Sequence, residues 1–428
     1  MASVRGGEPA RIVRWRGGAR AEWIVAGAVL LLYALWIALY LLAGHEPRDF
    51  IVLGRMHVLQ GHTSTLIQFD PRYHYDPDNA EGYDGQYCYF IAVDPTHAAA
   101  YIDWPAYRYG RILYPMLARL VALGQPDAIP LALIGVNWLA LGGGTLAVAA
   151  WLKRRGCSPW LALLYGCSTG LFIALQGDLT EPLAYALVAL AIYLFDFGGR
   201  RRVLWSGAAF ALALLTRESM AVFAALYGLA LLLGGTTQAA GGASSAPASA
   251  SAQRWLGELR GRIAANWRST ALLLTLAFLP FALYKGFLTL WLGSVGVPEA
   301  VRLDPVPFHG LLVYWPLPGA VLIEVDSVVL PALVCAGMGL WALKRRIWRV
   351  EIWVLLANIL FFVVLLPKAS YINLAASARI TTGVVLAALL CIPSMDRLTK
   401  GKRTWLAMCG ALWLAFLPIQ ALGLLQHH

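Results

Sequence analysis

The sequence predicts an all-α polytopic membrane protein with about 11 transmembrane helices and a large, partly helical first loop outside the membrane. Two observations support this prediction. Apolar residues make up 59% of the 428 residues and charged residues only 13%, about half the usual share of a soluble domain. Apolar runs of roughly 20 residues, the length that crosses a bilayer, recur between short basic segments. This composition excludes a soluble enzyme, a disordered chain and a fibrous protein.

The first predicted span covers residues 22–43 and follows a basic segment that contains Arg11, Arg14, Arg16 and Arg20. A signal peptide also begins with basic residues, but its apolar region is shorter, and no small-residue cleavage site follows this run. We therefore expect a membrane anchor. The other apolar runs lie at 128–152, 159–176, 179–197, 203–215, 219–233, 270–292, 320–343, 351–367, 380–395 and 404–424.

Basic clusters between these runs predict the orientation of the spans and account for much of the net charge of +11 without a nucleic-acid partner. Positively charged loops stay in the cytoplasm, so each stretch between two clusters crosses the membrane an even number of times and turns back outside. Outer turns are expected at 176–181, 216–218, 293–320 and 368–379, with the C-terminus outside. The clusters lie at 153–155, 200–202, 254–268, 344–346 and 397–403.

The chain then divides into six parts. Residues 234–253 are almost all small, which indicates a low-complexity linker, and the six cysteines lack the spacing of a zinc site or a disulfide framework. The parts are a cytoplasmic N-terminus (1–21), the first span (22–43), an extracytoplasmic cap (44–127), spans two to six (128–233), a cytoplasmic linker (234–269) and spans seven to eleven (270–428).

The cap is the longest polar stretch and holds ten of the 23 acidic residues of the chain. Structureless loops longer than about 12–15 residues are usually functional or disordered, and the many aromatic residues here argue against disorder. Some of these rings could simply belong to an aromatic belt at the membrane surface. We expect a folded cap with helices at 48–59, 85–92 and 111–123.

The segment 81–87 is the strongest candidate for chemistry within the cap. Gly82 and Gly85 flank Asp84 and permit tight turns and the close approach of a ligand. An Asp held there, beside the low dielectric of the lipid, could accept a proton from an attacking hydroxyl group. The alternative is an ordinary turn, since Asp-Gly is a common turn dipeptide.

Arg108 and Arg111 form a second cluster, and on a helix two residues three apart share one face. Guanidinium groups match the oxygen geometry of a phosphate. The alternative is that both arginines extend toward lipid headgroups.

The outer turns carry further charges at the same membrane boundary. A charge at the end of an apolar helix is costly unless it is paired or functional. Local pairing is one interpretation, and a charged cavity beneath the cap is the other. The residues are Asp178, Glu181, Arg217, Glu218, Lys368 and Arg379.

A metal site is not expected. Asp76 and Asp78 form an acidic pair that could hold a divalent ion, but Pro77 between them favours a turn. No glycine-rich phosphate loop indicates a nucleotide site. We expect no cofactor.

The ordered motifs Tyr83-Asp84-Gly85-Gln86-Tyr87, then Tyr107-Arg108, Arg111 and Pro115, then Leu215 to Glu218, resemble the GT-C class of integral-membrane glycosyltransferases. The most similar pattern is that of a bacterial group similar to the second mannosyltransferase of GPI-anchor synthesis. The resemblance covers about residues 80–220 and is one of topology beyond them.

The resemblance implies a polyprenyl-phosphate sugar as donor, a glycan or glycolipid as acceptor, and an active site facing the periplasm of a bacterial inner membrane. Asp84 takes the place of the catalytic base, and its acidic partner is left open among Glu81, Asp94 and Asp103. Charge and topology assign the donor phosphate to Arg108, Arg111, Arg217, Lys368 and Arg379. The expected substrate contacts are Tyr83, Gln86, Tyr87, Tyr107, Asp178, Glu181 and Glu218.

Three other functions fit the sequence. A glycan ligase or polymerase would use a polyprenyl-diphosphate donor. A lipid or glycolipid transporter would need charges in the middle of the membrane and broken helices. A non-catalytic assembly subunit would need none of the charged residues above.

Overall fold

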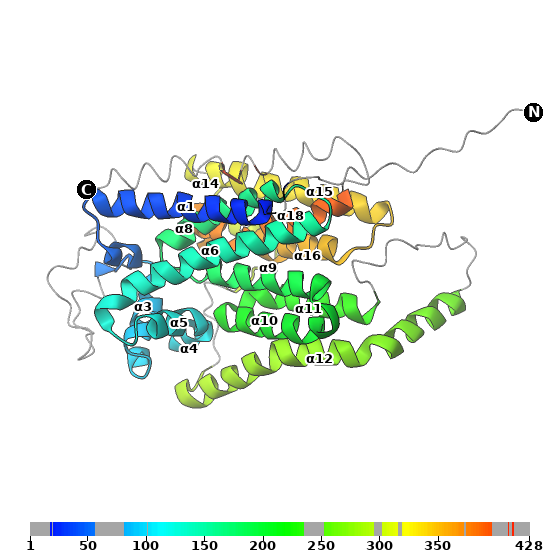
Figure 1. Cartoon of the computed structure of the whole chain (residues 1–428), viewed down its shortest axis with the longest axis horizontal. Helices are drawn as coiled ribbons and strands as arrows, with labels where there is room; N and C mark the ends of the chain where they lie inside the picture. The colour runs from blue at the N-terminus through cyan, green and yellow to red at the C-terminus, as the bar shows by residue number, and fades with distance from the viewer. Residues whose placement is uncertain are drawn as a thin grey trace, which may run out of the picture.

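A computed structural model shows a helical bundle with a smaller helical cap at one end (Figure 1). The structure describes residues 18, 20–55, 81–100, 102–234, 252–294, 302–315, 319–371, 374–395, 410, 413 and 414, and these contain no β-strand. The predicted all-α class is therefore confirmed for the described residues. The predicted last span, 404–424, lies almost wholly outside them.

The N-terminal half of the bundle is built from helices that pack in chain order, α1 on α6, α6 on α9 and α9 on α10. α9 and α10 meet at an angle of 120°, so they run back on each other around the basic turn at 199–201. Their other ends lie together, because Arg217, the residue after α10, lies 3.0 Å from Glu181 at the start of α9. The helices are α1 (Ala21–Leu42), α6 (Ile129–Arg154), α9 (Glu181–Phe197), α10 (Arg202–Thr216) and α11 (Ala221–Leu232).

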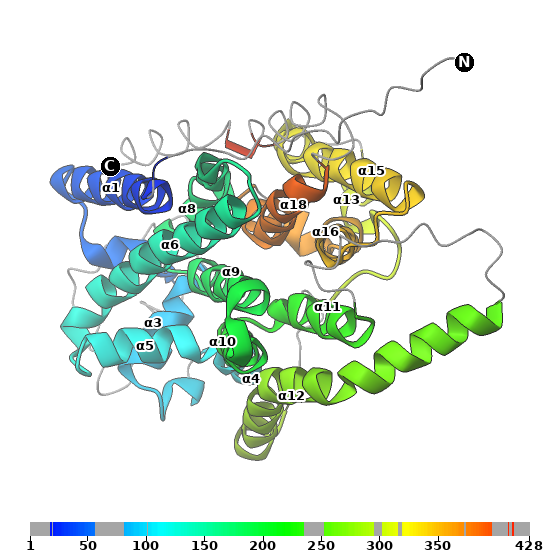
Figure 2. The same ribbon diagram turned by 45° about the vertical axis from the view of Figure 1, so that its right-hand side comes forward.

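α12 (Ala252–Leu292) lies along the outside of α10 and α11, and its N-terminal part extends away from the bundle (Figure 2). It begins at Ala252, inside the segment assigned to the linker, so that segment ends in helix. Most of its side chains are exposed, as expected for a helix that faces lipid.

The C-terminal half is more broken than the N-terminal half. α14 (Gly319–Glu324) passes through a π-helical turn, Val325–Val329, into α15 (Leu330–Lys344). α16 (Val350–Ile359) ends in a second π-helical turn, Leu360–Val364. α17 (Leu374–Ile380) and α18 (Thr382–Met395) are separated at Thr381.

By length and apolar character, four described helices could cross a membrane, or six if two bent helix pairs each count as one span. Three shorter apolar helices add to these, at Glu218–Leu232, Val350–Val364 and Thr382–Met395. The structure thus supports a membrane protein, while the total of about 11 spans stays a prediction.

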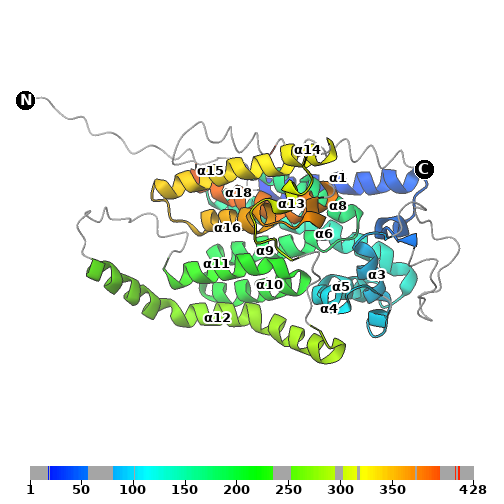
Figure 3. The same cartoon turned by 180° about the vertical axis from the view of Figure 1, so that it is seen from behind.

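The cap consists of short helices that gather at one end of α6 (Figures 1 and 3). The expected helix at 85–92 is confirmed, and the one at 111–123 is a 3-10 turn followed by α5. The expected helix at 48–59 is wrong: it stops at Ile51, because Val52 has a left-handed φ of 53°. The elements are η1 (Pro47–Ile51), α3 (Gly85–Val93), η2 (Ala98–Ala100), α4 (Pro105–Arg108), η3 (Tyr109–Arg111) and α5 (Leu113–Val121).

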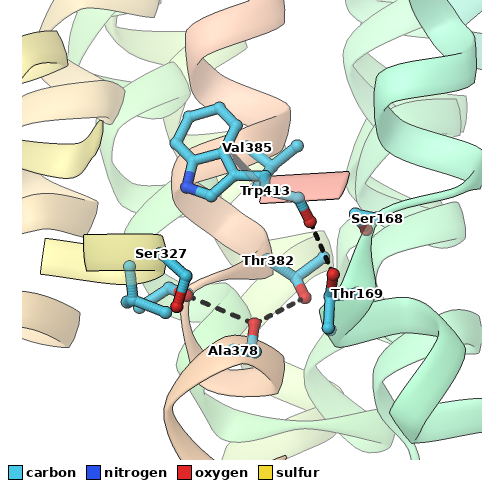
Figure 4. A pocket seen from close by; sticks show the side chains of 10 residues that line it. Ser168, Thr169, Ser327, Ala378, Thr382, Val385 and Trp413 are labelled. Atoms are coloured by element: carbon cyan, nitrogen blue, oxygen red, sulfur yellow. Dashed lines mark hydrogen bonds between the residues drawn. The ribbon is translucent and has the colours of Figure 1, made fainter. Parts of the chain in front are cut away.

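Three helix breaks meet around a small polar pocket below the cap (Figure 4). α7 (Leu163–Gly166) and α8 (Thr169–Gln176) are bent by 48° at Ser168. Ser168 and Thr169 face Ser327 of the first π-helical turn and Thr382 at the start of α18. A volume of about 20 Å³ leaves room for about one water molecule.

The segments above these breaks, α8 and α17, pack closely together. A Cβ atom added to Gly170 of α8 would lie 2.2 Å from the carbonyl oxygen of Ala378 in α17. α8 leads into the turn before Glu181, and α17 carries Arg379. The contact between α8 and α17 therefore lies next to the Arg379–Glu181 ion pair, in which Nη1 and Oε1 are 3.6 Å apart.

Candidate functional site

The backbone around Asp84 is shaped by the glycines on either side of it. Gly82 has a φ of +71°, and a Cβ atom on it would lie 2.3 Å from the amide nitrogen of Gly54. A Cβ atom on Gly85 would lie 2.0 Å from the carbonyl oxygen of Gly177. Both glycines were predicted to admit a ligand, but the group that approaches each of them is the protein's own backbone.

Asp84 is the N-cap residue of α3, yet its side chain does not cap the helix. An N-cap Asp usually accepts a hydrogen bond from an amide of the first helical turn. Here Oδ1 accepts a hydrogen bond from Nη1 of Arg108, and Oδ2 accepts one from Nη2 of Arg379, each 2.7 Å long. The carboxylate thus bridges an arginine of the cap and an arginine of the C-terminal half.

Arg108 is held by a second carboxylate as well. Its Nε and Nη2 atoms donate to the two oxygens of Asp103, at 2.7 and 3.0 Å. Its guanidinium lies over the ring of Tyr87, 3.9 Å from the centroid, which adds a cation–π contact. Among the three acids left open as partners of Asp84, Asp103 is the one that Arg108 joins to it. Asp94 instead bonds the turn that follows α3, through the amide and ring of His97.

Arg379 also has a second acidic neighbour, the fully buried Glu181. Its Nη1 atom lies 3.6 Å from Oε1 of Glu181, which lies 3.0 Å from Nη1 of Arg217. The same Arg217 atom donates to the hydroxyl of Thr180 at 3.2 Å. The start of α9, the end of α10 and the end of α17 are therefore joined through one buried carboxylate.

Arg111 and Glu218 form the last pair. Nη2 of Arg111 donates to Oε1 at 2.9 Å and Nε to Oε2 at 3.3 Å, a two-pronged contact that suits the planar guanidinium. Nη2 also donates to the hydroxyl of Tyr107, whose ring lies under the same guanidinium. Arg108 and Arg111, which were predicted to share a helix face, therefore both point into the site.

These contacts form one chain of ion pairs, which runs Asp103–Arg108–Asp84–Arg379–Glu181–Arg217, and the separate pair Arg111–Glu218 beside it. The formal charges of these four arginines and four carboxylates, together called the ionic network, cancel. All members of the ionic network except Glu181 line a cavity of about 850 Å³. Aromatic side chains of the cap form one wall of the cavity, and apolar side chains of the C-terminal half form another. The first wall has Trp104 and Tyr107, and the second has Leu303, Phe362, Leu366, Ala376 and Ile380.

The network controls the charge of its carboxyl groups. Burial alone would raise the pKa of Asp84, but Arg379, Arg108 and Arg111 outweigh it and hold the pKa well below its usual range. Burial likewise opposes ionisation of Glu218, yet Arg111 lowers its pKa to about 2. Asp84 is therefore an ion-paired carboxylate in this state, and a poor proton acceptor.

The other predicted contact residues have different positions. Tyr83 lines the cavity, its ring lies 4.9 Å from Cζ of Arg379, and burial raises the pKa of its hydroxyl to about 12. Gln86 touches the cavity, but its side chain amide accepts from the Gly54 amide and donates to the Glu81 carbonyl. The side chain of Gln86 therefore links Gly54 to Glu81, in the loop before α3, through two hydrogen bonds.

Three predicted residues do not line the cavity. The first, Glu181, is fully buried against Arg217 and Arg379. Asp178 is fully buried behind Gly85, where it accepts a hydrogen bond from the hydroxyl of Tyr114 at 3.4 Å and burial raises its pKa. Lys368 is exposed, and its ammonium group lies 5.8 Å from the ring centroid of Tyr314. None of the three side chains lines the 850 Å³ cavity.

Within the described ranges, no group of three or more His, Cys, Asp or Glu side chains could hold a metal ion. The acidic pair Asp76 and Asp78 lies outside the described residues.

Sequence reasoning named Asp103 only as one of three open partners of Asp84, and did not pair it with Arg108. It did not single out Trp104, Leu303 or Phe362 as site residues. Asp103 lies five residues before Arg108, and this spacing was the one signal that could have paired them. Nothing local marks Leu303 and Phe362, because they reach the cavity only through the packing of the C-terminal half.

Comparison with protein-family models, with curated proteins and with solved structures finds no match to the chain.

Proposed function

We propose that the chain is a membrane glycosyltransferase that moves a mannose-like sugar from a polyprenyl-phosphate donor to a glycan or glycolipid acceptor, at the periplasmic face of a bacterial inner membrane. One observation carries the proposal: a cavity large enough for a ligand combines four inward-facing arginines with the Asp84 carboxylate at the end of an apolar bundle. The resemblance of the motifs around Asp84 to GT-C enzymes supports the same reaction class.

The two sides of the donor match the two chemistries of the cavity. A phosphodiester would bind to Arg108, Arg111, Arg217 and Arg379, whose planar groups suit phosphate oxygens. The polyprenyl chain would lie against Phe362, Leu366 and Ile380. Lys368 has no place in this assignment, because its exposed side chain does not reach the cavity.

The acceptor would bind at the aromatic wall of the cap, where the faces of Trp104 and Tyr107 can stack on a sugar ring. In the reaction the acceptor oxygen attacks the anomeric carbon as its proton passes to Asp84. The bond from that carbon to the phosphate oxygen breaks, and the oxygen keeps the electron pair. A single displacement inverts the anomeric centre, and the arginines stabilise the leaving phosphate.

The test uses purified protein in detergent with radiolabelled polyprenyl-phosphate mannose and a glycan extract of the cell envelope. We expect wild type to move label to the acceptor and Asp84→Asn to lose the activity. Asp127→Asn is the matched control, since the Asp127 side chain is 93% exposed and, among the described residues, forms an ion pair with Arg48 of the cap alone. Full transfer by a well-folded Asp84→Asn protein would contradict the proposal.

A lipid or glycolipid transporter is the second candidate, and the helix breaks around Ser168 and Thr381 favour it. Transport of a labelled lipid-linked glycan across liposomes, with no sugar transfer, would identify this function. A third possibility is a ligase with a diphosphate donor, which would be distinguished by offering polyprenyl-diphosphate glycan in the transfer assay.

A further inference from the structure

Asp84 accepts hydrogen bonds from the same guanidinium nitrogens that the phosphate of the sugar donor would need. Its two oxygens accept from Nη1 of Arg108 and Nη2 of Arg379, so the carboxylate lies between two guanidinium groups as two phosphate oxygens would. With 26% of its side chain exposed, Asp84 is accessible from the cavity. A phosphate therefore cannot contact both arginines at these atoms while Asp84 remains there.

The two arginines do not depend on Asp84 for their positions. Arg108 is also held by Asp103, and Arg379 also lies beside Glu181. In addition, Nε and Nη1 of Arg379 make no hydrogen bond to any part of the chain that the structure describes, although Arg379 is largely buried. Each arginine thus keeps an acidic neighbour when Asp84 leaves, Asp103 for Arg108 and Glu181 for Arg379.

Every element packed around Asp84 contributes to its electrostatic surroundings. The positive groups come from α4, η3, α17 and the turn after α10. The negative groups come from the loop before α4, from α9 and from the 3-10 helix η7 (Glu218–Met220). Tyrosines of α3 and its preceding loop complete the set. The residues are Arg108, Arg111, Arg217, Arg379, Asp103, Glu181, Glu218, Tyr83 and Tyr87.

We propose that Asp84 is a resident counter-ion that the donor phosphate displaces from Arg108 and Arg379, and that only the displaced carboxylate accepts the acceptor's proton. This inference rests on the proposed function for its second half. Its first half, the displacement, is a statement about anion binding alone. Donor binding would then activate the base, so that the hydroxyl group loses its proton only when a donor is present.

The proton and the charges balance in this sequence of steps. The phosphodiester carries one negative charge and binds to Arg108 and Arg379 in place of Asp84. The carboxylate of Asp84 then accepts a hydrogen bond from the acceptor hydroxyl group. Asp84 takes the proton as the new carbon–oxygen bond forms and the carbon–phosphate oxygen bond breaks. The phosphate monoester leaves with the lipid, and Asp84 releases its proton to solvent and returns to the two arginines.

The test measures binding of farnesyl phosphate, a short lipid phosphate, to the full chain in detergent by calorimetry. Since Asp84→Asn removes the competing charge, we expect it to bind the probe at least about fivefold more tightly than wild type. Asp103→Asn removes an anchor of Arg108 and should bind more weakly. A structural role for Asp84 predicts the opposite order, with Asp84→Asn the weaker binder.

Asp84→Ser provides a second variant without the charge, in case the Asn protein does not fold. Equal or weaker binding by both variants, at wild-type thermal stability, would overturn the inference, and so would the absence of farnesyl phosphate binding by every protein. Tighter binding by the variants without any sugar transfer by wild type would keep the displacement and reject the glycosyltransferase.

Where transfer is measurable, the pH profiles of wild type give an independent readout. The acid limb of kcat/KM reports the free enzyme and that of kcat the complex. Displacement predicts that the acid limb of kcat lies at higher pH than that of kcat/KM. Coincident limbs would show that donor binding leaves the surroundings of Asp84 unchanged.

Discussion

Oδ2 of Asp84 and Nη2 of Arg379 are 2.7 Å apart, although the two residues are separated by 295 positions in the chain. Asp84 begins α3 in the cap, and Arg379 stands near the end of α17. The contact therefore exists only when the cap and the C-terminal half are packed together. It joins the two residue types, a carboxylate and a guanidinium, on which the proposed chemistry depends.

Replacement of Arg379 by Gln should lower transfer by about 100-fold or more, because a preorganised cation at a leaving phosphate typically contributes this much. Lys368→Gln is the matched control, since it removes a nearby positive charge that is exposed and does not line the cavity. We expect it to keep near wild-type transfer. Equal losses in the two variants would argue against a specific role for Arg379.

Replacement of Gly85 by Ala should destabilise the cap and abolish the arrangement around Asp84. The added Cβ atom would lie 2.0 Å from the Gly177 carbonyl oxygen, so α3 must move away from the turn before α9. The measurement is the thermal unfolding midpoint in detergent. Gly143→Ala in α6 is the control, because nothing lies within 4 Å of its Cβ position. Identical midpoints for the two variants would contradict this account.

The sequence predicted the local parts of the site well and the long-range parts poorly. Asp84 could be selected for the glycines that flank it, and Arg108 and Arg111 for their spacing of three. Arg217 and Arg379 could be selected because each lies at the end of an apolar run, where a charge is costly unless it is paired or functional. The structure brings all five together. The partner of each charge was not predictable, because pairing depends on packing between distant helices.

The positions of Lys368 and Asp178 illustrate the same limit. Lys368 and Asp178 also follow apolar runs, and their sequence context is no different from that of Arg379. A short 3-10 helix leaves Lys368 exposed, and Tyr114 and Gly85 cover Asp178. Likewise, the helix expected at 48–59 has suitable residues, but the reversal at Val52 allows its carbonyl to accept from Tyr83.

Transfer should persist after treatment with EDTA. The guanidinium of Arg108 lies between Asp84 and Asp103, the two carboxylates that could otherwise share a divalent ion. The measurement is transfer by wild type with and without chelator, followed by addition of Mg²⁺ or Mn²⁺. A loss of activity that either ion restores would show that a metal takes part, through these acids or through others.

The Arg111–Glu218 pair should stabilise the fold in a way that depends on pH. Since the pKa of Glu218 falls from 4.5 to about 2 on folding, its contribution is fully present above pH 4.5 and is lost as pH falls toward 2. The difference in unfolding midpoint between wild type and Glu218→Gln should therefore be largest near neutral pH and shrink below pH 4.5. Glu81→Gln serves as the control, because Glu81 is exposed. A constant difference across this range would mean that the pair does not act through the charge of Glu218.

The contact between α8 and α17 should affect catalysis more than stability. Gly170→Ala places a Cβ atom 2.2 Å from the Ala378 carbonyl oxygen, so α17 must shift relative to α8. Arg379 follows Ala378 directly, and the shift would change its distance from Asp84, since side chains in packed interiors have little free space to compensate. A displacement of about 1 Å can cost about 100-fold in rate.

The experiment measures both kcat and the unfolding midpoint, with Gly135→Ala as the control, since nothing lies within 4 Å of its Cβ position. We expect kcat to fall strongly in Gly170→Ala alone. An unchanged kcat would show that the position of Arg379 is set by its ion pairs and not by helix packing.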